Sequence, residues 1–507
     1  MEFTPSLLAL SISLVVFIWL KKNRKAHAAV PAMGPEGIFS SYLGALEYLK
    51  NAPKIIQKGY NQHKPMFRVP YPDKWMYVLS SARLIADLRK APEHELSPAH
   101  GFGATLAVKY TLGMRFVETP YHEMVVRREL TRSSNERLLD VWDEVVCAFG
   151  DEVGVKLIAG GGWVALPALE TVLRIVSRTS NRLFVGVELC RNADYRDLTI
   201  EYAENVIKRA RIINLFPDAL KPIVGPLVSP LRRGTSRASK HLAPIIEERL
   251  RKEETHDEDV DPNDLISWLI THAPADSPEE KTIPALIQRI MQINFLAVHT
   301  TANSFTQALY HLAAEPRYVA PLREEVEAAL SQENGWSKAT LGRCCKLDSF
   351  LRESQRFNGV SAINMHRKVL SPSGFTFSDG THLPMGTYIT AATYATHHDE
   401  GNYQDAEKFD GFRFARMREA EESEGSGSSK YQMSTPDPAF LAFGLGKHAC
   451  PGRFFAVTEL KLMLAYILLQ YDIRLEEEGV RPPSEWFGTT CGANRSAKVL
   501  FRKRFET

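Results

Sequence analysis

The sequence predicts a mainly α-helical fold with a smaller β region, preceded by an N-terminal transmembrane helix. Long helical patterns dominate the chain after about residue 100. The short runs MFRVPY and MYVLS, separated by Pro and Gly, predict a small sheet between about Gly37 and Leu88. An apolar run occupies the first twenty residues. No stretch near the centre of the 507 residues resembles a linker, so a single large domain is expected.

The N-terminal run TPSLLALSISLVVFIWL is followed at once by KKNRK, which is typical of a signal anchor. Its basic flank is expected to stay in the cytoplasm under the positive-inside rule. We therefore divide the chain into a membrane anchor with its basic flank (1–25), a Pro-containing tether (26–40) and one catalytic domain (41–507) that faces the cytosol. The alternative is a buried N-terminal helix, which the asymmetry of the flanks disfavours.

Composition excludes some classes of function. The net charge is only +2, and no DNA- or RNA-binding motif is present, so no nucleic-acid partner is expected. The six cysteines show no framework spacing and no CxxC pair, which suits a reducing compartment.

The stretch FLAFGLGKHACPGRFFA, from Phe440 to Ala456, carries the clearest chemical signal. We predict Cys450 as an iron ligand, because backbone N–H donors, a helix N-terminus and the iron itself can hold a thiolate. Gly444 and Gly446 allow positive φ or a close approach to a flat ring. A lone buried Cys is more often a packing residue, but the flanking pattern favours the ligand.

The motif FGLGKHACPG resembles the haem loop of the cytochrome P-450 family, FGxGxHxCxG, and fills every fixed position. The resemblance implies the cytochrome P-450 fold around one heme b, with Cys450 as the axial ligand of the iron. It also implies that Lys447 lies near the haem propionates. The loop residues that it assigns to haem binding are Phe443, Gly444, Gly446, His448, Cys450 and Gly452.

Two further motifs match the same family. LDSFLRESQRFNG places Glu353 and Arg356 at i and i+3 of a helix, which alone is a common surface pair. This segment is followed by FDGFRF. The pair matches the family's ExxR element, and Arg413 of FDGFRF matches the arginine that follows it in the family. The resemblance implies that the three residues form a buried charge cluster that fixes the haem-side architecture.

A long helix is predicted from Pro284 to Leu312, interrupted by polar residues in AVHTT. By resemblance to the family's AGxDT, Ala297, His299 and Thr300 stand at the Gly, acid and Thr positions. We hypothesise that Thr300 steadies dioxygen and its proton delivery while His299 links it to solvent. Two alternatives stay open: the Thr300 hydroxyl bonds its own helix backbone, and His299 is neutral and merely hydrogen-bonded.

The remaining site residues follow from the resemblance. Arg367 is expected to meet a propionate. The helix YHEMVVRRELT lacks the family's usual Trp and basic pair, so His122, Arg127 or Arg128 is left for the other propionate contact. The apolar segment 212–230 resembles one that dips into the bilayer beside the substrate entrance, with lipid phosphates near Arg237. The predicted pocket residues are Ala297, Val360, Ile363 and Thr489.

Together with the N-terminal anchor, the resemblance to this family implies a single-pass monooxygenase of the endoplasmic reticulum membrane. It would oxidise a lipophilic small molecule, a terpenoid or related secondary metabolite, with O2 and NADPH. Electrons would arrive from NADPH–cytochrome P-450 reductase, docked near Lys447 and Arg453, with cytochrome b5 as a second donor. One alternative is a haem-thiolate isomerase or dehydratase that acts on peroxides without a reductase. The other is a non-catalytic haem-binding protein on the membrane.

Overall fold

The computed structural model describes residues 30–72, 74–160, 162–229, 231–255, 263–423 and 430–504. The predicted anchor with its basic flank, residues 1–25, lies outside these ranges. Among the helices within them, none is long and apolar enough to cross a bilayer.

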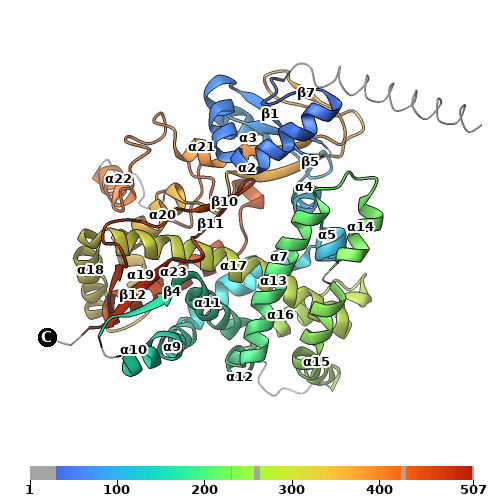
Figure 1. The fold of residues 1–507 in the computed structure, drawn as a ribbon. Coiled ribbons are helices and arrows are strands. Elements are labelled where there is room, and N and C mark those ends of the chain that lie inside the picture. The colour runs from blue at the N-terminus through green and yellow to red at the C-terminus, as the bar shows by residue number, and fades with distance from the viewer. Residues whose placement is uncertain are drawn as a thin grey trace, which may run out of the picture.

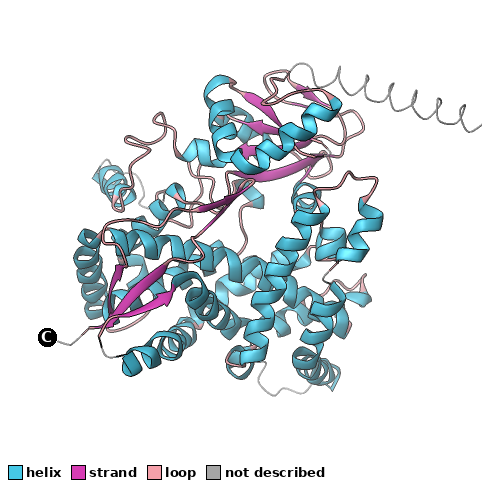
Figure 2. Ribbon diagram, viewed as in Figure 1, coloured by secondary structure: helices cyan, strands magenta, loops and turns pink. Residues whose placement is uncertain are grey.

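The fold is mainly helical with small sheets, as predicted (Figures 1 and 2). The largest sheet lies at one end of the molecule, at the top of Figure 1, and most of the helices form the body below it. Its strands run in the order β1 (Met66–Pro70), β2 (Trp75–Leu79), β8 (Tyr388–Ala392), β5 (Ile363–Val369) and β3 (Leu96–Ser97).

The strand runs read from the sequence form the first hairpin of this sheet. In β1 and β2, Met66 pairs with Leu79 and Pro70 pairs with Trp75 in antiparallel register. β2 then pairs with β8 in parallel, which brings residues far apart in the sequence into one sheet. All five residues of β1 are buried, because the helix α2 (Ile38–Gln62) packs against it. This explains why the run is apolar without strict alternation.

Three smaller β units complete the β region. One is a three-stranded sheet near the C-terminus, and two are hairpins, of which the second carries the turn Gly488–Thr489. The sheet contains β4 (Val164–Pro167), β12 (Lys498–Lys503) and β9 (Tyr471–Leu475); the hairpins are β6 (Phe375–Thr376) with β7 (His382–Leu383), and β10 (Glu485–Phe487) with β11 (Thr490–Gly492).

The long helix α17 (Ile283–Ala314) runs through the middle of the body (Figure 1). Pro284 lies in its first turn, where a missing N–H costs no helical bond, and Pro316 follows its end. Most of its residues are buried, because helices pack on several sides of it. These are α11 (Ala168–Phe184), α13 (Ala193–Ile213), α15 (Leu231–Thr255) and α20 (Cys345–Phe357).

The other helices cover this centre. In chain order they are α3 (Ala82–Lys90), α4 (Pro98–Thr105), α5 (Val108–Thr111), α6 (Arg115–Glu118), α7 (Tyr121–Val125), η1 (Val126–Leu130), α8 (Thr131–Glu136), α9 (Leu138–Phe149), η2 (Gly150–Gly154), α10 (Val155–Gly160), α12 (Gly186–Cys190), α14 (Lys221–Val228), α16 (Leu265–Thr271), η3 (Pro278–Lys281), η4 (Pro316–Tyr318), α18 (Val319–Gln332), α19 (Lys338–Arg343), α21 (Thr393–His397), α22 (Arg413–Ser423), η5 (Gly446–His448) and α23 (Arg453–Gln470).

The described part of the predicted tether, from residue 30 onward, lies along β1. The Met33 N–H donates to the Arg68 carbonyl at 2.8 Å, and the Arg68 N–H donates to the Pro31 carbonyl at 2.9 Å. α2 then begins at Ile38, inside the predicted tether range of 26–40. The sheet therefore fixes the chain before the first helix begins.

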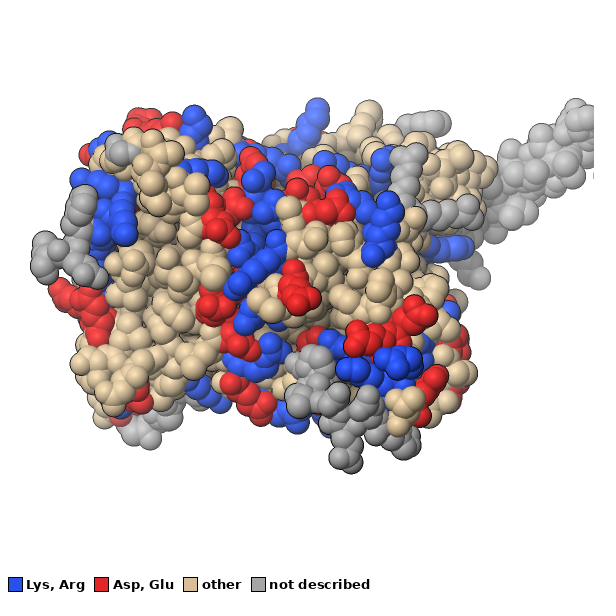
Figure 3. All heavy atoms as spheres, turned by 90° about the horizontal axis from the view of Figure 1, so that it is seen from below, with Lys and Arg blue, Asp and Glu red and all other residues tan. Residues whose placement is uncertain are grey.

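The face at the bottom of Figure 1 has no single sign of charge. Figure 3 shows Lys and Arg interspersed with Asp and Glu across it. Ion pairs account for part of this mixing, for example Arg191 of the loop after α12 with Asp143 of α9 at 3.0 Å. Such a face gives no extended positive field for a polyanion.

A buried carboxyl group links α23 to α11. Glu459 of α23 is fully buried and accepts hydrogen bonds from the Ser180 hydroxyl, at 2.9 Å, and from the Thr179 hydroxyl. Its partners are hydroxyl groups rather than a cation, so burial raises the pKa of Glu459 to about 7.

We predict that Glu459 makes the stability of the holoenzyme depend on pH. The native pKa is above the ordinary value of 4.5, so its stabilising contribution is complete below about pH 4.5 and is lost as pH rises through about 7. The loss amounts to about 3 kcal/mol. Urea unfolding between pH 5 and 8 should show this slope in the wild type, and Glu459→Gln should remove it.

The matched control is Glu478→Gln, which neutralises an exposed carboxylate. It should leave the slope unchanged. A Glu459→Gln protein that keeps the wild-type slope would contradict the assignment.

Candidate active site

The Cys450 loop is shaped by local backbone constraints. The Cys450 N–H donates to the Phe443 carbonyl at 2.7 Å, which closes the loop just before α23 begins. Gly444 and Gly446 have φ of 72° and 77°, a region that residues with a Cβ rarely adopt. A Cβ on Gly446 would also lie 2.4 Å from the Arg89 side chain. The loop therefore needs glycine at both positions.

The sulfur of Cys450 is buried, and the pKa of its thiol is raised overall above the ordinary value. Burial raises the pKa of the Cys450 thiol, while the backbone N–H groups of Gly452 and Arg453 and the charge of the Arg453 guanidinium act in the opposite direction. Backbone donors at the start of a helix are the environment that a metal-bound thiolate requires. The residues present therefore fit an iron ligand at this position.

Arg367 is a buried cation beside the loop, without a strong ionic partner. Its side chain is 4% exposed, and it donates to the His366 carbonyl at 2.9 Å. Burial lowers the pKa of Arg367 to about 10. Burial and the nearby Arg367 charge also lower the pKa of His448 to about 4. Within the described ranges no carboxylate forms an ion pair with Arg367, so this site fits the propionates of a haem.

The structure distinguishes the three candidates for the other propionate contact. Arg127 donates to the Lys447 carbonyl of the loop at 2.8 Å. His122 is buried and lies 3.1 Å from Arg289, and burial lowers its pKa to about 3. Arg128 is exposed, and no contact with the loop is seen for it among the described residues. Of the three, Arg127 lies against the Cys450 loop.

One cavity of about 380 Å³ joins the central helix to the Cys450 loop. Its wall includes Thr300 and His299 of α17 and Ala442 of the loop. The predicted pocket residues Val360, Ile363 and Thr489 also line it.

The structure differs from the prediction at one pocket residue, because Ala297 is not part of this lining. Leu296, His299 and Thr300 line the cavity and Ala297 does not, although Leu296 and Ala297 both pack partly buried against the hydrophobic core. Leu296 and Thr300, four residues apart, lie on one face of the helix, whereas Ala297 lies further around the helix axis.

Thr300 and His299 make hydrogen bonds within the protein. The Thr300 hydroxyl donates to the Leu296 carbonyl four residues earlier, at 2.7 Å, so its oxygen can still accept a bond in the cavity. His299 Nε2 lies 3.1 Å from the Ile200 carbonyl of α13, and burial lowers the pKa of His299. A neutral His299 therefore ties α17 to α13. This bond agrees with the alternative of a neutral, hydrogen-bonded His299, and the link from His299 to solvent stays a prediction.

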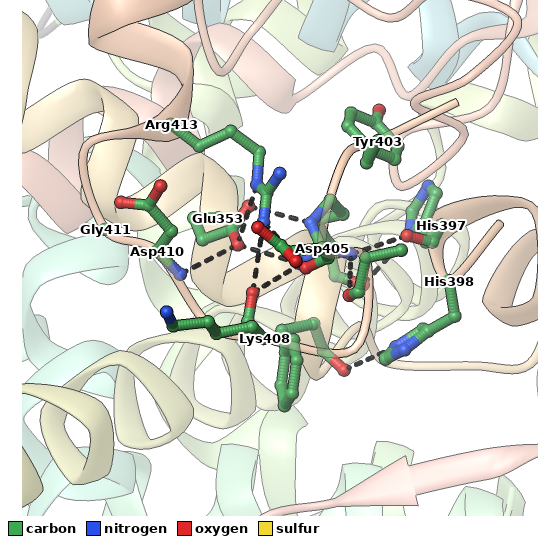
Figure 4. Close-up of polar contacts among 12 residues, drawn as sticks. Glu353, His397, His398, Tyr403, Asp405, Lys408, Asp410, Gly411 and Arg413 are labelled. Carbon is green, nitrogen blue, oxygen red and sulfur yellow. Dashed lines mark hydrogen bonds and ion pairs between the residues drawn. The ribbon is translucent and has the colours of Figure 1, made fainter. Parts of the chain in front are cut away.

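The charge cluster around Glu353 is buried and fully bonded (Figure 4). Arg356 makes two hydrogen bonds to the Glu353 carboxylate, at 2.7 and 2.8 Å, and Arg413 makes a third at 3.2 Å. Arg356 and Arg413 use their remaining N–H groups on carbonyls of residues 397–408. The cluster thus holds α20, the segment after α21 and the start of α22 together.

His397 connects this cluster to the Cys450 loop. Its Nδ1 lies 3.2 Å from the Arg356 carbonyl, and its Nε2 accepts the Leu441 N–H at 2.9 Å. Burial lowers the pKa of His397 well below its ordinary value, so the ring is neutral and can accept this bond. Asn364 supports the same backbone by donating to the Leu441 and Ala442 carbonyls. Sequence reasoning missed His397 and the bonds of Asn364 to the loop, since no local motif marks them.

The segment 212–230 forms α14 and its flanks, and it exposes apolar side chains. Ile223 and Leu227 are 63% and 82% exposed. Arg237, expected to meet lipid phosphates, instead pairs with Asp194 and with Glu201, the latter at 2.8 Å. The apolar surface of the predicted segment is present, but Arg237 is already neutralised within the protein.

Comparison with known proteins identifies relatives over nearly the whole chain. The family model described as Cytochrome P450 matches residues 41–498. Cytochrome P450 monooxygenase 151 of Postia placenta is 41% identical over 505 residues, 99% of each chain. Cytochrome P450 monooxygenase CYP512U6 of Ganoderma lucidum is 32% identical over 94% of this chain and 92% of its own. Ent-kaurene oxidase of Gibberella intermedia is 32% identical over 94% and 88%.

We predict that Glu353→Ala abolishes haem incorporation. Removing the carboxylate leaves two buried guanidinium groups unpaired, which costs about 3–5 kcal/mol. The ratio of haem to protein after purification measures the effect.

Glu170→Ala is the control, because it removes one partner of an exposed i,i+4 pair with Arg174. That change should cost less than about 1 kcal/mol and leave haem content intact. Full haem content in Glu353→Ala would refute the structural role of the cluster.

Proposed function

Since this chain belongs to the cytochrome P450 family, we propose that it oxidises a lipophilic small molecule, a terpenoid or related secondary metabolite, using O2 and electrons from NADPH. One observation carries the proposal: a single cavity is bounded by Thr300 of α17 and by Ala442 of the Cys450 loop. A substrate in this cavity would lie between the hydroxyl group and the predicted iron ligand.

The family implies a haem, and the loop offers the groups to hold it. Cys450 would bind the iron, and Arg367 and Arg127 would bind the propionates, because these cations lie beside the loop. When bound, a haem with a thiolate ligand supplies activation of O2, because the thiolate pushes electron density toward the iron and favours cleavage of the O–O bond.

The chain's own residues would orient the substrate, exclude water and place a hydrogen-bond acceptor in the cavity. Apolar side chains such as Phe295 and Leu296 line the cavity and exclude water from the reaction. The Thr300 oxygen would accept a hydrogen bond from a group or water in the cavity while its own O–H donates to the Leu296 carbonyl. His299 holds this turn of α17 against α13.

Members of this family generally receive electrons from a redox partner. We propose NADPH–cytochrome P-450 reductase as that partner, docking beside the exposed Lys447 and the nearby Arg453, with cytochrome b5 as a second donor. Lys447 is already paired with Glu93 at 3.1 Å, so the contact would involve both charges.

We further propose that residues 1–25 anchor the protein in the endoplasmic reticulum membrane with the catalytic domain in the cytosol. The exposed side chains of Ile223 and Leu227 on α14 support an additional contact with lipid. The terpenoid substrate class is supported by the similarity to ent-kaurene oxidase at 32% identity and by the apolar cavity.

The function is tested by deleting the gene in the source organism and, separately, replacing Cys450 by Ser. We expect both strains to accumulate the same lipophilic compound, lighter than the lost product by one or more oxygen atoms, in untargeted metabolite mass spectrometry. A Cys450→Ser strain that still makes the product would rule out thiolate chemistry.

Reconstitution with a reductase separates the alternatives. A haem-thiolate isomerase or dehydratase would form its product from a peroxide without NADPH. A non-catalytic haem-binding protein would leave the accumulated compound unchanged in the presence of active reductase and NADPH.

We predict that Thr300→Ala uncouples NADPH consumption from product formation. Loss of the only hydroxyl group that α17 contributes to the cavity, among the described residues, removes the group that orders water there. Product formed per NADPH should fall about tenfold, as expected for loss of one hydrogen bond worth about 1.4 kcal/mol, while peroxide rises.

Thr306→Ala is the matched control. Its hydroxyl also bonds the helix backbone, at the Ala302 carbonyl, but it is buried away from the cavity. Coupling should stay near the wild-type ratio in this variant. A wild-type ratio of product to NADPH in Thr300→Ala would contradict the proposed role of Thr300.

A further inference from the structure

Arg211 of α13 stands at the mouth of the cavity. An outer surface groove also includes Lys208 and Arg209, and it shares Arg211, Leu215 and Phe487 with the lining of the cavity. These three residues therefore form the boundary between the groove and the cavity.

The Arg211 guanidinium group has no acidic partner in the described protein. The side chain is half-buried, and its charged group lies 4.2 Å from the centre of the Phe487 ring. Within the described ranges no Asp or Glu forms an ion pair with it. Burial, with a further contribution from the charge of Arg495, lowers the pKa of Arg211.

Two other arginines at α13, Arg237 and Arg196, are neutralised by carboxylates. Arg237 pairs with two carboxylates, and Arg196 of the same helix pairs with Glu152 at 3.2 Å and with Asp197 at 2.9 Å. Partly burying a cation without a partner is unfavourable, and an anionic ligand would offset that penalty.

The lining of the cavity has an uneven distribution of charge. Among the residues that the structure describes, no Asp or Glu lines it. Its other cation, Lys74, lies over the Tyr388 ring at 4.5 Å. Inward from Arg211, α13 contributes only apolar side chains, those of Ile207 and Ala210. The cavity thus combines a positive mouth with an apolar interior.

We propose that Arg211 binds the carboxylate of an amphiphilic substrate whose apolar body fills the cavity. A guanidinium fork matches a carboxylate with two parallel hydrogen bonds, and stacking on Phe487 holds the fork in place. With its acid group held at the mouth, the substrate presents a carbon remote from the carboxylate to Thr300. This inference rests on the proposed function and names its substrate class.

The test compares matched acids and esters on the holoenzyme. Equilibrium dialysis measures binding of hexadecanoic acid and abietic acid, each against its methyl ester, at pH 7.5. The wild type should bind at least one acid about tenfold more tightly than its ester. Arg211→Gln should weaken binding of that acid about 10- to 100-fold, as expected for loss of a charge-assisted pair, and leave the ester unchanged.

Two variants control for charge. Arg211→Lys should retain part of the preference for the acid, because it keeps a cation without the fork. Arg209→Gln removes the same charge two residues away, in the groove but outside the cavity lining, and should bind the acid and its ester as the wild type does.

Equal binding of every acid and its ester by the wild type would overturn the proposal, as would an Arg211→Gln protein that keeps the preference. A third overturning result is weaker binding of Arg211→Gln to phosphatidylserine vesicles with the acid preference intact, which would assign the guanidinium to a lipid headgroup. NADPH-dependent oxidation of the bound ligands is measured separately. Its absence in the wild type would count against the proposed monooxygenase function, whereas the binding ratio reports on Arg211 alone.

Discussion

The buried carboxylate of Glu353 is the interaction on which the Cys450 loop depends. Arg356 of α20 and Arg413 of α22 both bond this carboxylate. Their remaining N–H groups donate to backbone carbonyls of the segment between the two helices. From Arg356 the neutral ring of His397 continues the contact to the Leu441 N–H. Because each link is buried and bonded, the loop that carries the predicted iron ligand is held by a polar network rather than by apolar packing alone.

Charges in this protein serve two different purposes. The charged groups around Glu353 form ion pairs with one another inside the fold, so their role is architectural. Arg367 and Arg211 are buried or half-buried and lack an ionic partner in the described structure. The first lies beside the Cys450 loop and the second at the mouth of the cavity. A charged group that lacks an ionic partner, in a position that ligands can reach, indicates a binding site, because the ligand supplies the opposite charge.

The helix α17 relates these sites to one another. It presents Thr300 to the cavity, and the bond from His299 to the Ile200 carbonyl ties it to α13, the helix that carries Arg211. The position of the cavity mouth is therefore coupled to the turn that bears Thr300. His299 makes this contact through Nε2, and burial lowers its pKa, which favours the neutral ring as the hydrogen-bond donor.

The sequence by itself determined what depends on local pattern: the paired strand runs, the long central helix, and a Cys450 loop whose glycines need positive φ. Other features were decided only by the tertiary structure. They are the link through His397, the placement of Arg127 rather than Arg128 against the loop, the turning of Ala297 away from the cavity, and the isolation of Arg211. The membrane anchor stays a prediction. The physical reason for the division is distance along the chain: periodicity and backbone preference act over a few residues, whereas hydrogen bonds and unpaired charges depend on residues that only folding brings together.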